Sequence, residues 1–453
     1  MLMGMAICIA RAATPPLFCY HNTMPDASSA SPSAVLPVAR EDIDAAYETL
    51  RPVVRRTPLE LSARLSEFYN ARVYLKREDL QTVRSYKIRG AYNCMSRLSQ
   101  TQRERGVVCA SAGNHAQGVA LSCRLLETRG TIFMPQNTPR QKIARVRSLG
   151  GDWVTLELIG DTFDEAKALS LDFATREGWT QVPPFDDPQV IAGQGTVARE
   201  IFEQLGQLET ETLDHLIVPV GGGGLLAGSL VYAQAVSPAT RLTGVEPMGA
   251  ASLRAAFDAG RVVRLATMDT FVDGAAVLQA GQIPFQICAT LRPDLVAVPE
   301  GHVCTVMIEL YQQDGIITEP AGSLTIAALD NLRAEIEGKT VVCVVSGGNN
   351  DISRYPEIIE RSLIYQGLKH YFLIAFSQRA GALRQYLDDV LGPTDDITLF
   401  EYTKKNNREF GSTLVGIELA DKGNLAPLLA RMDAIGLRYQ SVERDSLLYR
   451  FLV

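Results

Sequence analysis

The stretch HLIVPVGGGGLLAG, residues 215–228, joins an apolar, β-branched run to four consecutive glycines and then to the start of a helical pattern. Consecutive glycines let several backbone N–H groups converge on one anion, and the positive end of the following helix stabilises that charge. The stretch therefore predicts a buried strand followed by a phosphate-binding loop. It lacks the G-K-[ST] ending of a P-loop, and Leu226 replaces the last glycine of a dinucleotide-binding G-x-G-x-x-G. A tight strand-to-helix turn without a ligand is the alternative interpretation.

Strands and small-residue loops of the same kind lie on both sides of this stretch. From residue 40 to about residue 360, short β-branched runs alternate with longer helical patterns, which is typical of parallel strands joined by helices. The expected strands are VVCAS (107–111), TIFMP (131–135), DWVTLEL (152–158), HLIVPV (215–220), RLTGVEP (241–247) and TVVCVVS (340–346). Open α/β sheets bind ligands just beyond the carboxyl ends of their strands. We therefore expect one binding site where the loops after these strands meet.

A compact unit of different pattern follows YPEIIERSLIYQGLKH, residues 355–370. Its expected elements are a strand at 371–376, a helix at 380–391, strands at 397–405 and 412–419, a helix at 424–436 and a last strand, LLYRFLV, at 447–453. The order β-α-β-β-α-β is that of the split ferredoxin-like arrangement. Because the unit contains no catalytic constellation, it suggests regulation or oligomerisation, with plain structural support as the alternative.

Two of the loops contain side chains suited to a small ligand. In SAGNH, residues 111–115, serine and asparagine side chains beside exposed backbone donors can hold a carboxylate or a phenolate oxygen. In SGGNND, residues 346–351, the serine hydroxyl can meet a ring nitrogen. The sequence has five histidines and no H-E-x-x-H or comparable His/Cys cluster, so it does not predict a zinc site.

SYKIRGA, residues 85–91, contains the lysine of greatest interest. A lysine that its site keeps deprotonated can form an imine with an aldehyde cofactor, and the preceding aromatic residue, Tyr86, can pack against that cofactor's ring. Taken by itself, Lys87 is more simply interpreted as a solvated surface charge.

Composition excludes several classes of protein. A net charge of −7 at pH 7, with Lys and Arg evenly spread, gives no basic stripe for nucleic acid. The sequence has no near-continuous apolar stretch of about 18 or more residues, so no membrane-spanning helix is expected. Eight cysteines without a C-x-x-C pair, with Cys109 and Cys343 in apolar runs, indicate buried thiols in a reducing cytoplasm.

The first 38 residues differ from the rest. They are weakly apolar and then rich in Ala, Ser and Pro, and they lack the charged start of a signal peptide. We expect a disordered extension, or a start codon assigned too early with Met24 as the true start; an organellar transit peptide is a further alternative.

Together and in this order, the motifs resemble the threonine and serine dehydratases of pyridoxal phosphate (PLP) fold type II, over residues 40 to about 355. The motifs are KREDLQ with SYKIRGA, SAGNHAQG, GDTFDEA, PFDDP with GQGT, VPVGGGGLLAG, GVEP, EPAGS and SGGNND. The C-terminal unit, with FSQRAGALRQYL, DDITLFEYTKKNNRE and LVGIEL, resembles the single ACT-like regulatory unit of short biosynthetic threonine dehydratases. The resemblance implies two open α/β subdomains in residues 39–362 and a regulatory domain in residues 363–453.

The resemblance also implies a role for each matching residue. Lys87 is expected to carry PLP as an imine, with Tyr86 against the ring, Asn114 at the phenolic oxygen and Ser346 at the pyridine nitrogen. The phosphate is expected in a cup formed by Gly221, Gly222, Gly223, Gly224 and Leu225. The substrate carboxylate is expected among Ser111, Gly113, Asn114 and His115. No metal ligand is expected.

The implied reaction is the dehydration and deamination of L-threonine to 2-oxobutanoate and ammonia, the first step of isoleucine biosynthesis. Lys87 is the implied base for the α-proton, and a neutral serine at the ring nitrogen favours elimination over transamination. The same resemblance implies serine as a secondary substrate, feedback inhibition by isoleucine, and a cytoplasmic homotetramer.

Single residues separate neighbouring families. Ile88 and Arg89 follow the lysine, whereas threonine and cysteine synthases of this fold typically have K-D-R. Ala112 stands where serine racemases have their second acid-base serine, and Ser252 stands where they have an acidic metal ligand six positions after Glu246. The chain therefore resembles the lyases, and racemisation is expected to be minor or absent.

The C-terminal unit departs from the family's usual F-P-E-x-P-G-A-L at Ser377, Gln378 and Ala380. Two alternatives follow. One is a catabolic serine/threonine dehydratase with a vestigial C-terminal unit, which isoleucine would not affect. The other is a catalytically inactive amino-acid sensor, which release of ammonia from threonine would exclude.

Overall fold

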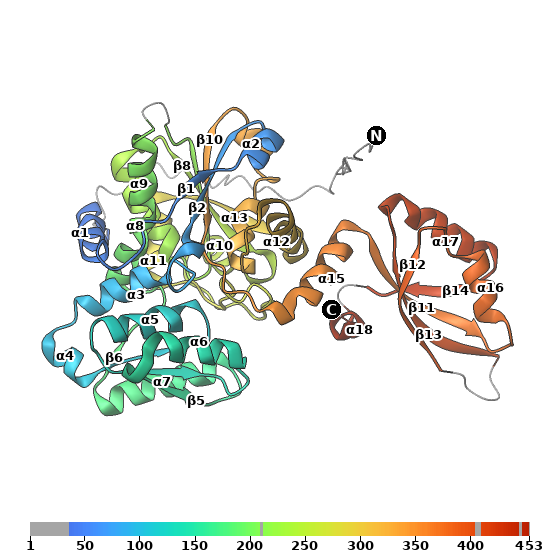
Figure 1. Ribbon diagram of the computed structural model, residues 1–453, viewed down its shortest axis with the longest axis horizontal. Helices are drawn as coiled ribbons and strands as arrows, with labels where there is room; N and C mark the ends of the chain where they lie inside the picture. Colours follow the sequence, from blue (N-terminus) through green and yellow to red (C-terminus); the bar gives the residue numbers. More distant parts are fainter. Residues whose placement is uncertain (1–35, 209–211, 404–408, 444–445, 453) are drawn as a thin grey trace, which may run out of the picture.

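The computed structural model describes residues 36–208, 212–403, 409–443 and 446–452, which form three sheets with their helices (Figure 1). The extension expected over residues 1–38 lies outside the described residues up to position 35. Val38, at its end, is 1% exposed. Within the described ranges, no helix combines the length and apolar composition needed to cross a membrane.

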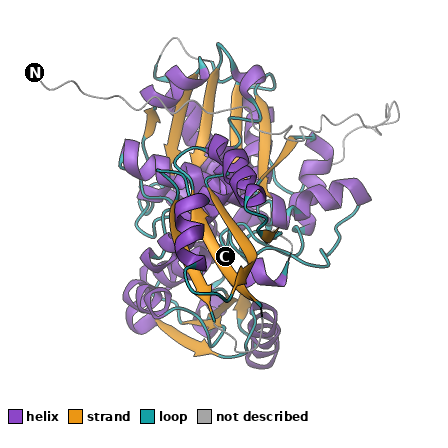
Figure 2. Cartoon of the chain, turned by 90° about the vertical axis from the view of Figure 1, so that its right-hand side faces the viewer, coloured by secondary structure: helices purple, strands orange, loops and turns teal. Residues whose placement is uncertain are grey.

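The large sheet has the strand order β1-β2-β10-β7-β8-β9. Its strands are Leu59–Leu61, Arg72–Arg77, Thr340–Val345, His215–Pro219, Arg241–Pro247 and Asp294–Val298 in that order. Apart from the antiparallel β1, neighbouring strands run parallel and stand side by side between helices (Figure 2). Strands covered on both faces need continuous apolar runs, which is the pattern that the sequence shows in TVVCVV and HLIVP.

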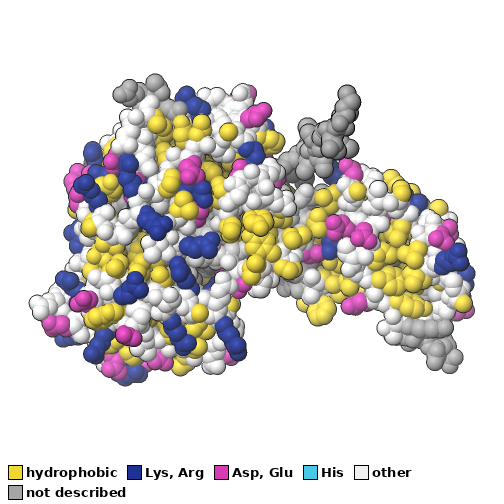
Figure 3. Space-filling model, viewed as in Figure 1, with side chains coloured by type: hydrophobic (Ala, Val, Ile, Leu, Met, Phe, Trp, Pro, Cys, Tyr) yellow, Lys and Arg dark blue, Asp and Glu magenta, His cyan; other side chains and the backbone are white. Residues whose placement is uncertain are grey.

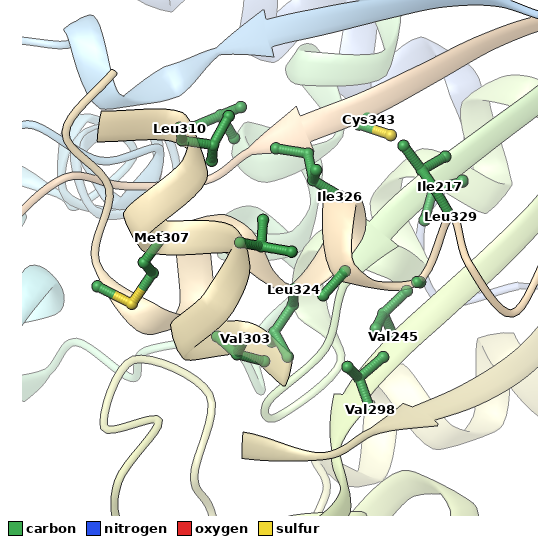
Figure 4. Packing of buried hydrophobic residues seen from close by; sticks show 14 of the residues in the cluster. Ile217, Val245, Val298, Val303, Met307, Leu310, Leu324, Ile326, Leu329 and Cys343 are labelled. Carbon is green, nitrogen blue, oxygen red and sulfur yellow. The ribbon is translucent and has the colours of Figure 1, made fainter. Parts of the chain in front are cut away.

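Helices cover both faces of the large sheet. One face packs against α1 (Arg40–Leu50), α8 (Pro188–Gly206), α9 (Gly224–Val236) and α11 (Gln282–Leu291). The other packs against α2 (Ala63–Tyr69), α12 (Glu300–Asp314), α13 (Pro320–Ala327) and α14 (Arg333–Ile336). Figure 4 shows this second core, with side chains from α12 and α13 facing Ile217, Val245, Val298 and Cys343 of the strands. Alternation along β10 sends Val342 and Val344 to the first core and Val341 and Cys343 to the second.

The small sheet, β5-β4-β3-β6, is parallel throughout. Its strands are Val154–Leu158, Gly130–Met134, Val107–Ala110 and Thr180–Gln181. Its helices are α3 (Lys87–Ser96), α4 (Gln100–Arg105), α5 (Asn114–Leu125), α6 (Arg140–Gly150) and α7 (Phe163–Glu177). The predicted pair of open α/β subdomains is therefore confirmed.

Helix α15 (Tyr355–Gln366) leads from the large sheet to an antiparallel sheet of order β12-β13-β11-β14. The strands are Asp396–Tyr402, Phe410–Glu418, Lys369–Ser377 and Arg438–Ser441, and the helices are α16 (Ala382–Asp389) and α17 (Leu425–Ala434). In chain order the strands lie 2-3-1-4, which is the arrangement of the predicted β-α-β-β-α-β unit.

The prediction of LLYRFLV as the last strand is wrong. Residues Leu447–Leu452 form helix α18, whose first turn is capped by Ser446 Oγ, which accepts from Tyr449 N at 3.1 Å. The last strand is instead β14, which pairs with β11 at the edge of the sheet. Periodicity cannot separate a short apolar run that is a strand from one that is helical, and an edge strand needs few apolar residues. The polar sequence RYQS of β14 therefore gave no strand signal.

Candidate active site

Three predicted loops meet beyond the carboxyl ends of β10, β7 and β3. The segment before α3 pairs with the loop after β10, because Ser85 and Gly347 form a β-bridge and Tyr86 N donates to Ser346 O at 3.1 Å. This pairing sets the start of α3, where Lys87 is the first residue, beside Ser346.

Lys87 Nζ lies next to a backbone carbonyl and two aromatic rings. It donates to Pro184 O at 3.0 Å and lies 5.2 Å from the ring centroid of Tyr86 and 6.0 Å from that of Phe185. Burial lowers the pKa of Lys87 to about 8, although the nearby Glu319 opposes this shift. At pH 7 about a tenth of this amine is then uncharged and can act as a nucleophile or base, far more than for an ordinary lysine.

The glycine loop after β7 has no room for side chains. A Cβ on Gly222 would lie 2.3 Å from the Phe185 ring, and one on Gly224 would lie 2.6 Å from Gln194 Oε1. Gly223 has φ +90°, a conformation that favours glycine. The loop leads into the N-terminus of the 13-residue helix α9, so its amides and the helix dipole favour an anion. Phe185 connects this loop to Lys87.

Asn114, the first residue of α5, uses both atoms of its amide. Nδ2 donates to Glu319 Oε1 at 2.6 Å, and Oδ1 accepts from Asn349 Nδ2 at 2.7 Å. Asn349 Nδ2 also donates to Val83 O at 2.8 Å. Since Nδ2 has two hydrogens, one remains for a further acceptor in the site.

Glu319 is a site residue that the sequence interpretation missed. It is 4% exposed, and burial, followed by the charge of Asp273, raises the pKa of its carboxyl to about 7. It belongs to the family motif EPAGS, which by itself assigns the carboxyl no role. An acidic residue inside the apolar run IITEPAGSL was the available signal, because buried carboxylates are rare without a function or a partner.

The expected substrate loop is present, but His115 is engaged elsewhere. Ser111 Oγ accepts from Gly113 N at 3.2 Å, at the start of α5. The His115 ring is buried, with Nε2 at 2.8 Å from Val182 O, and burial lowers its pKa to about 3. A neutral ring that donates through Nε2 leaves an acceptor at Nδ1, so the ring does not supply a cation for a carboxylate. The backbone amides at the N-terminus of α5 are better placed to do so.

Glu246 serves as a helix cap. Its two carboxyl oxygens accept from Leu253 N at 2.7 Å and Arg254 N at 2.9 Å, at the start of α10 (Ser252–Ala259). Burial raises the pKa of this carboxyl to about 7. Among the residues that the structure describes, no group of three or more His, Cys, Asp and Glu side chains is arranged to hold a metal ion.

The donor set fits PLP, the cofactor implied by the resemblance. An amine of lowered pKa suits its aldehyde, and the glycine loop at the start of α9 suits its phosphate. The buried Ser346 hydroxyl, which donates to Ala321 O at 3.3 Å, can turn toward a ring nitrogen. Gln194 Oε1, at the glycine loop, is buried without a hydrogen-bond partner among the described residues. The structure therefore brings Lys87, the glycine loop and Ser346 together.

Comparisons with known proteins agree with this site. A family model for pyridoxal-phosphate-dependent enzymes matches residues 50–347, and a model for the C-terminal regulatory domain of threonine dehydratase matches residues 360–452. The biosynthetic L-threonine dehydratase of Mycobacterium tuberculosis is 53% identical over 428 residues, which are 94% of this chain and 98% of that protein. The enzyme of the same name from Bacillus subtilis is 52% identical over 408 residues, 90% of this chain and 96% of that protein.

A solved structure gives the same result. The processed form of threonine deaminase isoform 2 from Solanum lycopersicum superposes with a TM-score of 0.66 at 40% identity, covering 71% of this chain and 92% of that one. The resemblance drawn from the motifs is thereby confirmed. The chain belongs to the biosynthetic threonine dehydratases, PLP-dependent enzymes with a C-terminal regulatory domain.

Proposed function

We propose that this protein is a threonine ammonia-lyase, which converts L-threonine to 2-oxobutanoate and ammonia as the first step of isoleucine biosynthesis. Two relatives with 53% and 52% identity carry the name of that enzyme. The structural observation that carries the proposal is the position of Lys87 Nζ, which binds Pro184 O at 3.0 Å and faces the same Phe185 ring that the glycine loop contacts.

Each site residue has a proposed task. Lys87 holds PLP covalently, Tyr86 packs against its ring, and Asn114 and Ser346 bind the phenolic oxygen and the ring nitrogen. The phosphate binds in the cup of Gly221, Gly222, Gly223, Gly224 and Leu225. The substrate carboxylate binds at Ser111, Gly113, Asn114 and His115, the last through its backbone amide and not its ring. Support comes from the shared location of the loops and from the helix N-termini at Asn114 and Gly224.

When bound, PLP delocalises the negative charge that develops on the substrate α-carbon. Once the amine of threonine has displaced it from the cofactor, Lys87 Nζ would be free to remove the α-proton, for which its lowered pKa suits it. Ala112 offers no acid or base beside the substrate loop, so Lys87 is the proposed sole base. Ser346 is a neutral partner for the ring nitrogen, whereas a carboxylate there would favour a protonated ring. These features favour elimination over racemisation and transamination.

A threonine saturation curve with purified protein and added PLP tests the proposal. We expect 2-oxobutanoate and ammonia in equal amounts from wild type, none from Lys87→Ala, and unchanged rates from Lys167→Ala, an exposed lysine of α7. Wild-type protein that binds no PLP and releases no ammonia from threonine would contradict the proposal and favour an amino-acid sensor.

We further propose that isoleucine inhibits the enzyme by binding the C-terminal domain. A cavity of about 470 Å³ lies there between β11, α16 and β12. Its lining includes Arg379 and Arg384, which suit a carboxylate, and Leu387, Phe400 and Tyr402, which suit an aliphatic side chain. Ser377 and Gln378, two of the three departures from the family pattern, also line it.

Kinetics with isoleucine test this second proposal. Saturating isoleucine should raise the threonine concentration needed for half-maximal rate, and Arg379→Ala should weaken this effect without changing the rate in its absence. Threonine kinetics unchanged by isoleucine would support the catabolic alternative.

We propose serine as a secondary substrate, because one methyl group in an apolar pocket changes discrimination by only about 1 to 3 kcal/mol. We also propose a cytoplasmic homotetramer, with the catalytic and regulatory domains in residues 39–362 and 363–453. The cysteines of the described part are free and buried, which suits a reducing compartment. Hydrophobic side chains gather over the C-terminal domain on the face shown in Figure 3, which suits subunit contacts. Light scattering of the purified protein measures the subunit number.

A further inference from the structure

Four buried charges lie next to the lysine of the site. Arg89, two residues after Lys87, is 0% exposed, and its partners Glu78, Glu200 and Lys76 are 0% or 1% exposed. The group holds two positive and two negative charges, so it is neutral as a whole. Its members come from β2, the turn Glu78–Leu80, α3 and α8.

The Arg89 guanidinium uses all five of its N–H donors. Nε and Nη2 donate to Glu78 at 2.9 and 2.8 Å, and Nη1 and Nη2 donate to Glu200 at 2.8 and 2.9 Å. The fifth N–H, on Nη1, donates to Thr196 Oγ1 at 3.1 Å. The contacts with Glu78 and Glu200 are both bidentate, and we call them the two forks. Because they lie in the plane of the guanidinium, they fix both the position and the rotation of the side chain.

The Lys76 ammonium is equally satisfied. Nζ donates to Glu200 Oε2 at 2.7 Å, Thr57 O at 2.8 Å and Gln204 Oε1 at 2.9 Å. Glu78 also accepts from Thr57 Oγ1 at 2.6 Å. Removing these charges from water is costly, and apolar side chains of similar volume are often as stabilising or more so. Apolar packing would not fix the orientation of the Arg89 side chain as the two forks do.

Helix α8 links Arg89 to the glycine loop, because its backbone packs closely against both α3 and α9. A Cβ on Gly193 of α8 would lie 2.5 Å from Arg89 O, and one on Gly195 would lie 3.0 Å from Gly228 O of α9. A Cβ on Gly228 would in turn lie 2.5 Å from Ile191 O of α8. Thus α3, which begins with Lys87, and α9, which begins at the glycine loop, both contact α8 without intervening side chains.

We propose that Arg89 is a positioning residue, which through its forks to Glu78 and Glu200 holds Lys87 at a fixed separation from the glycine loop. The inference rests on the proposed role of Lys87 as the lysine that binds PLP. In this role Arg89 contacts neither the substrate nor the cofactor.

The charge-balanced double variant Arg89→Met/Glu78→Gln tests the proposal, because it leaves the Lys76–Glu200 pair intact. Apoprotein is mixed with PLP, reduced with borohydride after set times, and the modified Lys87 peptide is quantified by mass. We expect the double variant to fold. The rate at which PLP attaches to Lys87 and the kcat for threonine should both fall about tenfold or more, because a small displacement of a reacting group lowers its rate strongly. KM for threonine should stay within about threefold.

Arg89→Lys keeps the charge but loses both forks, because an ammonium has no planar pair of donors, and it is the second test should the double variant not fold. It should fold and show an intermediate loss of PLP attachment. Arg64→Lys is the matched control. Arg64 of α2 also forms a bidentate contact, with Asp314 of α12, and neither helix is one of those that link Lys87 to the glycine loop. The control should attach PLP like wild type.

Folded Arg89 variants that attach PLP and turn over threonine like wild type would overturn the inference and leave the network a role in stability alone. Wild-type protein that attaches no PLP to Lys87 would instead refute the proposed function. The two failures are therefore distinguishable.

Discussion

The Asn114 side-chain amide donates to Glu319 Oε1 over 2.6 Å and thereby joins α5 of the small subdomain to the N-cap residue of α13 in the large one. The carboxyl is buried, and this partner is a neutral amide, which stabilises an ionised carboxylate less than a cation would. Burial, followed by the charge of Asp273, raises the pKa of Glu319 to about 7, and the hydrogen bond from Asn114 offsets this only in part. The contact therefore depends on pH in the range where the enzyme is expected to work.

Glu319→Gln should change how stability depends on pH. The folded pKa of about 7 exceeds the ordinary value of 4.5, so the folded protein binds more protons than the unfolded chain between these values. This contribution to the free energy of unfolding is fully present below the unfolded pKa of 4.5, and it is lost as the pH rises through the folded pKa of about 7. Relative to the variant, wild-type apoprotein should lose about 3 kcal/mol of unfolding free energy across this range.

Denaturant unfolding of both apoproteins from about pH 4.5 to about pH 8 measures this difference. Glu246, whose pKa is also raised, is present in both proteins and cancels. Parallel curves for wild type and Glu319→Gln would show that Glu319 does not titrate in this range.

Gly193→Ala should lower the unfolding free energy by about 1 to 3 kcal/mol, because its Cβ would lie 2.5 Å from Arg89 O and force α3 away from α8. Gly206→Ala is the matched control at the end of the same helix, where a Cβ meets nothing within 4 Å. It should be neutral or stabilising by up to about 1 kcal/mol. Equal effects of the two changes in thermal unfolding would contradict the close packing of α3 on α8.

Chelation should leave threonine turnover unchanged. Both oxygens of Glu246 cap α10, at 2.7 and 2.9 Å from backbone amides. Ser252 stands at the position where the serine racemases have an acidic metal ligand. Rates with EDTA, with Mg²⁺ and with neither should therefore agree. A loss of rate in EDTA that Mg²⁺ restores would refute this expectation.

Glu246→Ala should be destabilising for the same reason. It leaves two amides at the start of α10 without their acceptor, and loss of a cap costs about 1 to 2 kcal/mol. Denaturant unfolding of wild type and variant, with PLP bound in both, measures this cost. An unchanged unfolding midpoint would contradict the capping role.

Much of the fold follows from the sequence because buried parallel strands leave continuous apolar runs. The strands expected at 107–111, 215–220 and 340–346 agree with β3, β7 and β10 to within a residue or so. The error at LLYRFLV has the opposite cause. The real last strand, β14, is a polar edge strand, whereas Leu447 and Phe451 of α18 are 83% exposed, so an apolar run did not indicate a buried strand there.

The site was predictable where a loop carries its own chemistry, as at Gly221–Gly224 and Ser346. It was not predictable where contacts join distant segments. Asn114 meets Glu319 across 205 residues, and Arg89 meets Glu200 across 111. Nothing in the sequence KREDLQ marks its charges as buried, yet Lys76 and Glu78 are buried. Pairing of opposite charges from separate elements is visible only once the chain is folded.

The most direct test of the central claim is to locate PLP on the purified wild-type protein. Borohydride reduction followed by peptide mass mapping should place the cofactor on Lys87, and the same protein should release ammonia from threonine before reduction but not after it. A cofactor found on another lysine, or threonine turnover by protein that carries none, would contradict the account.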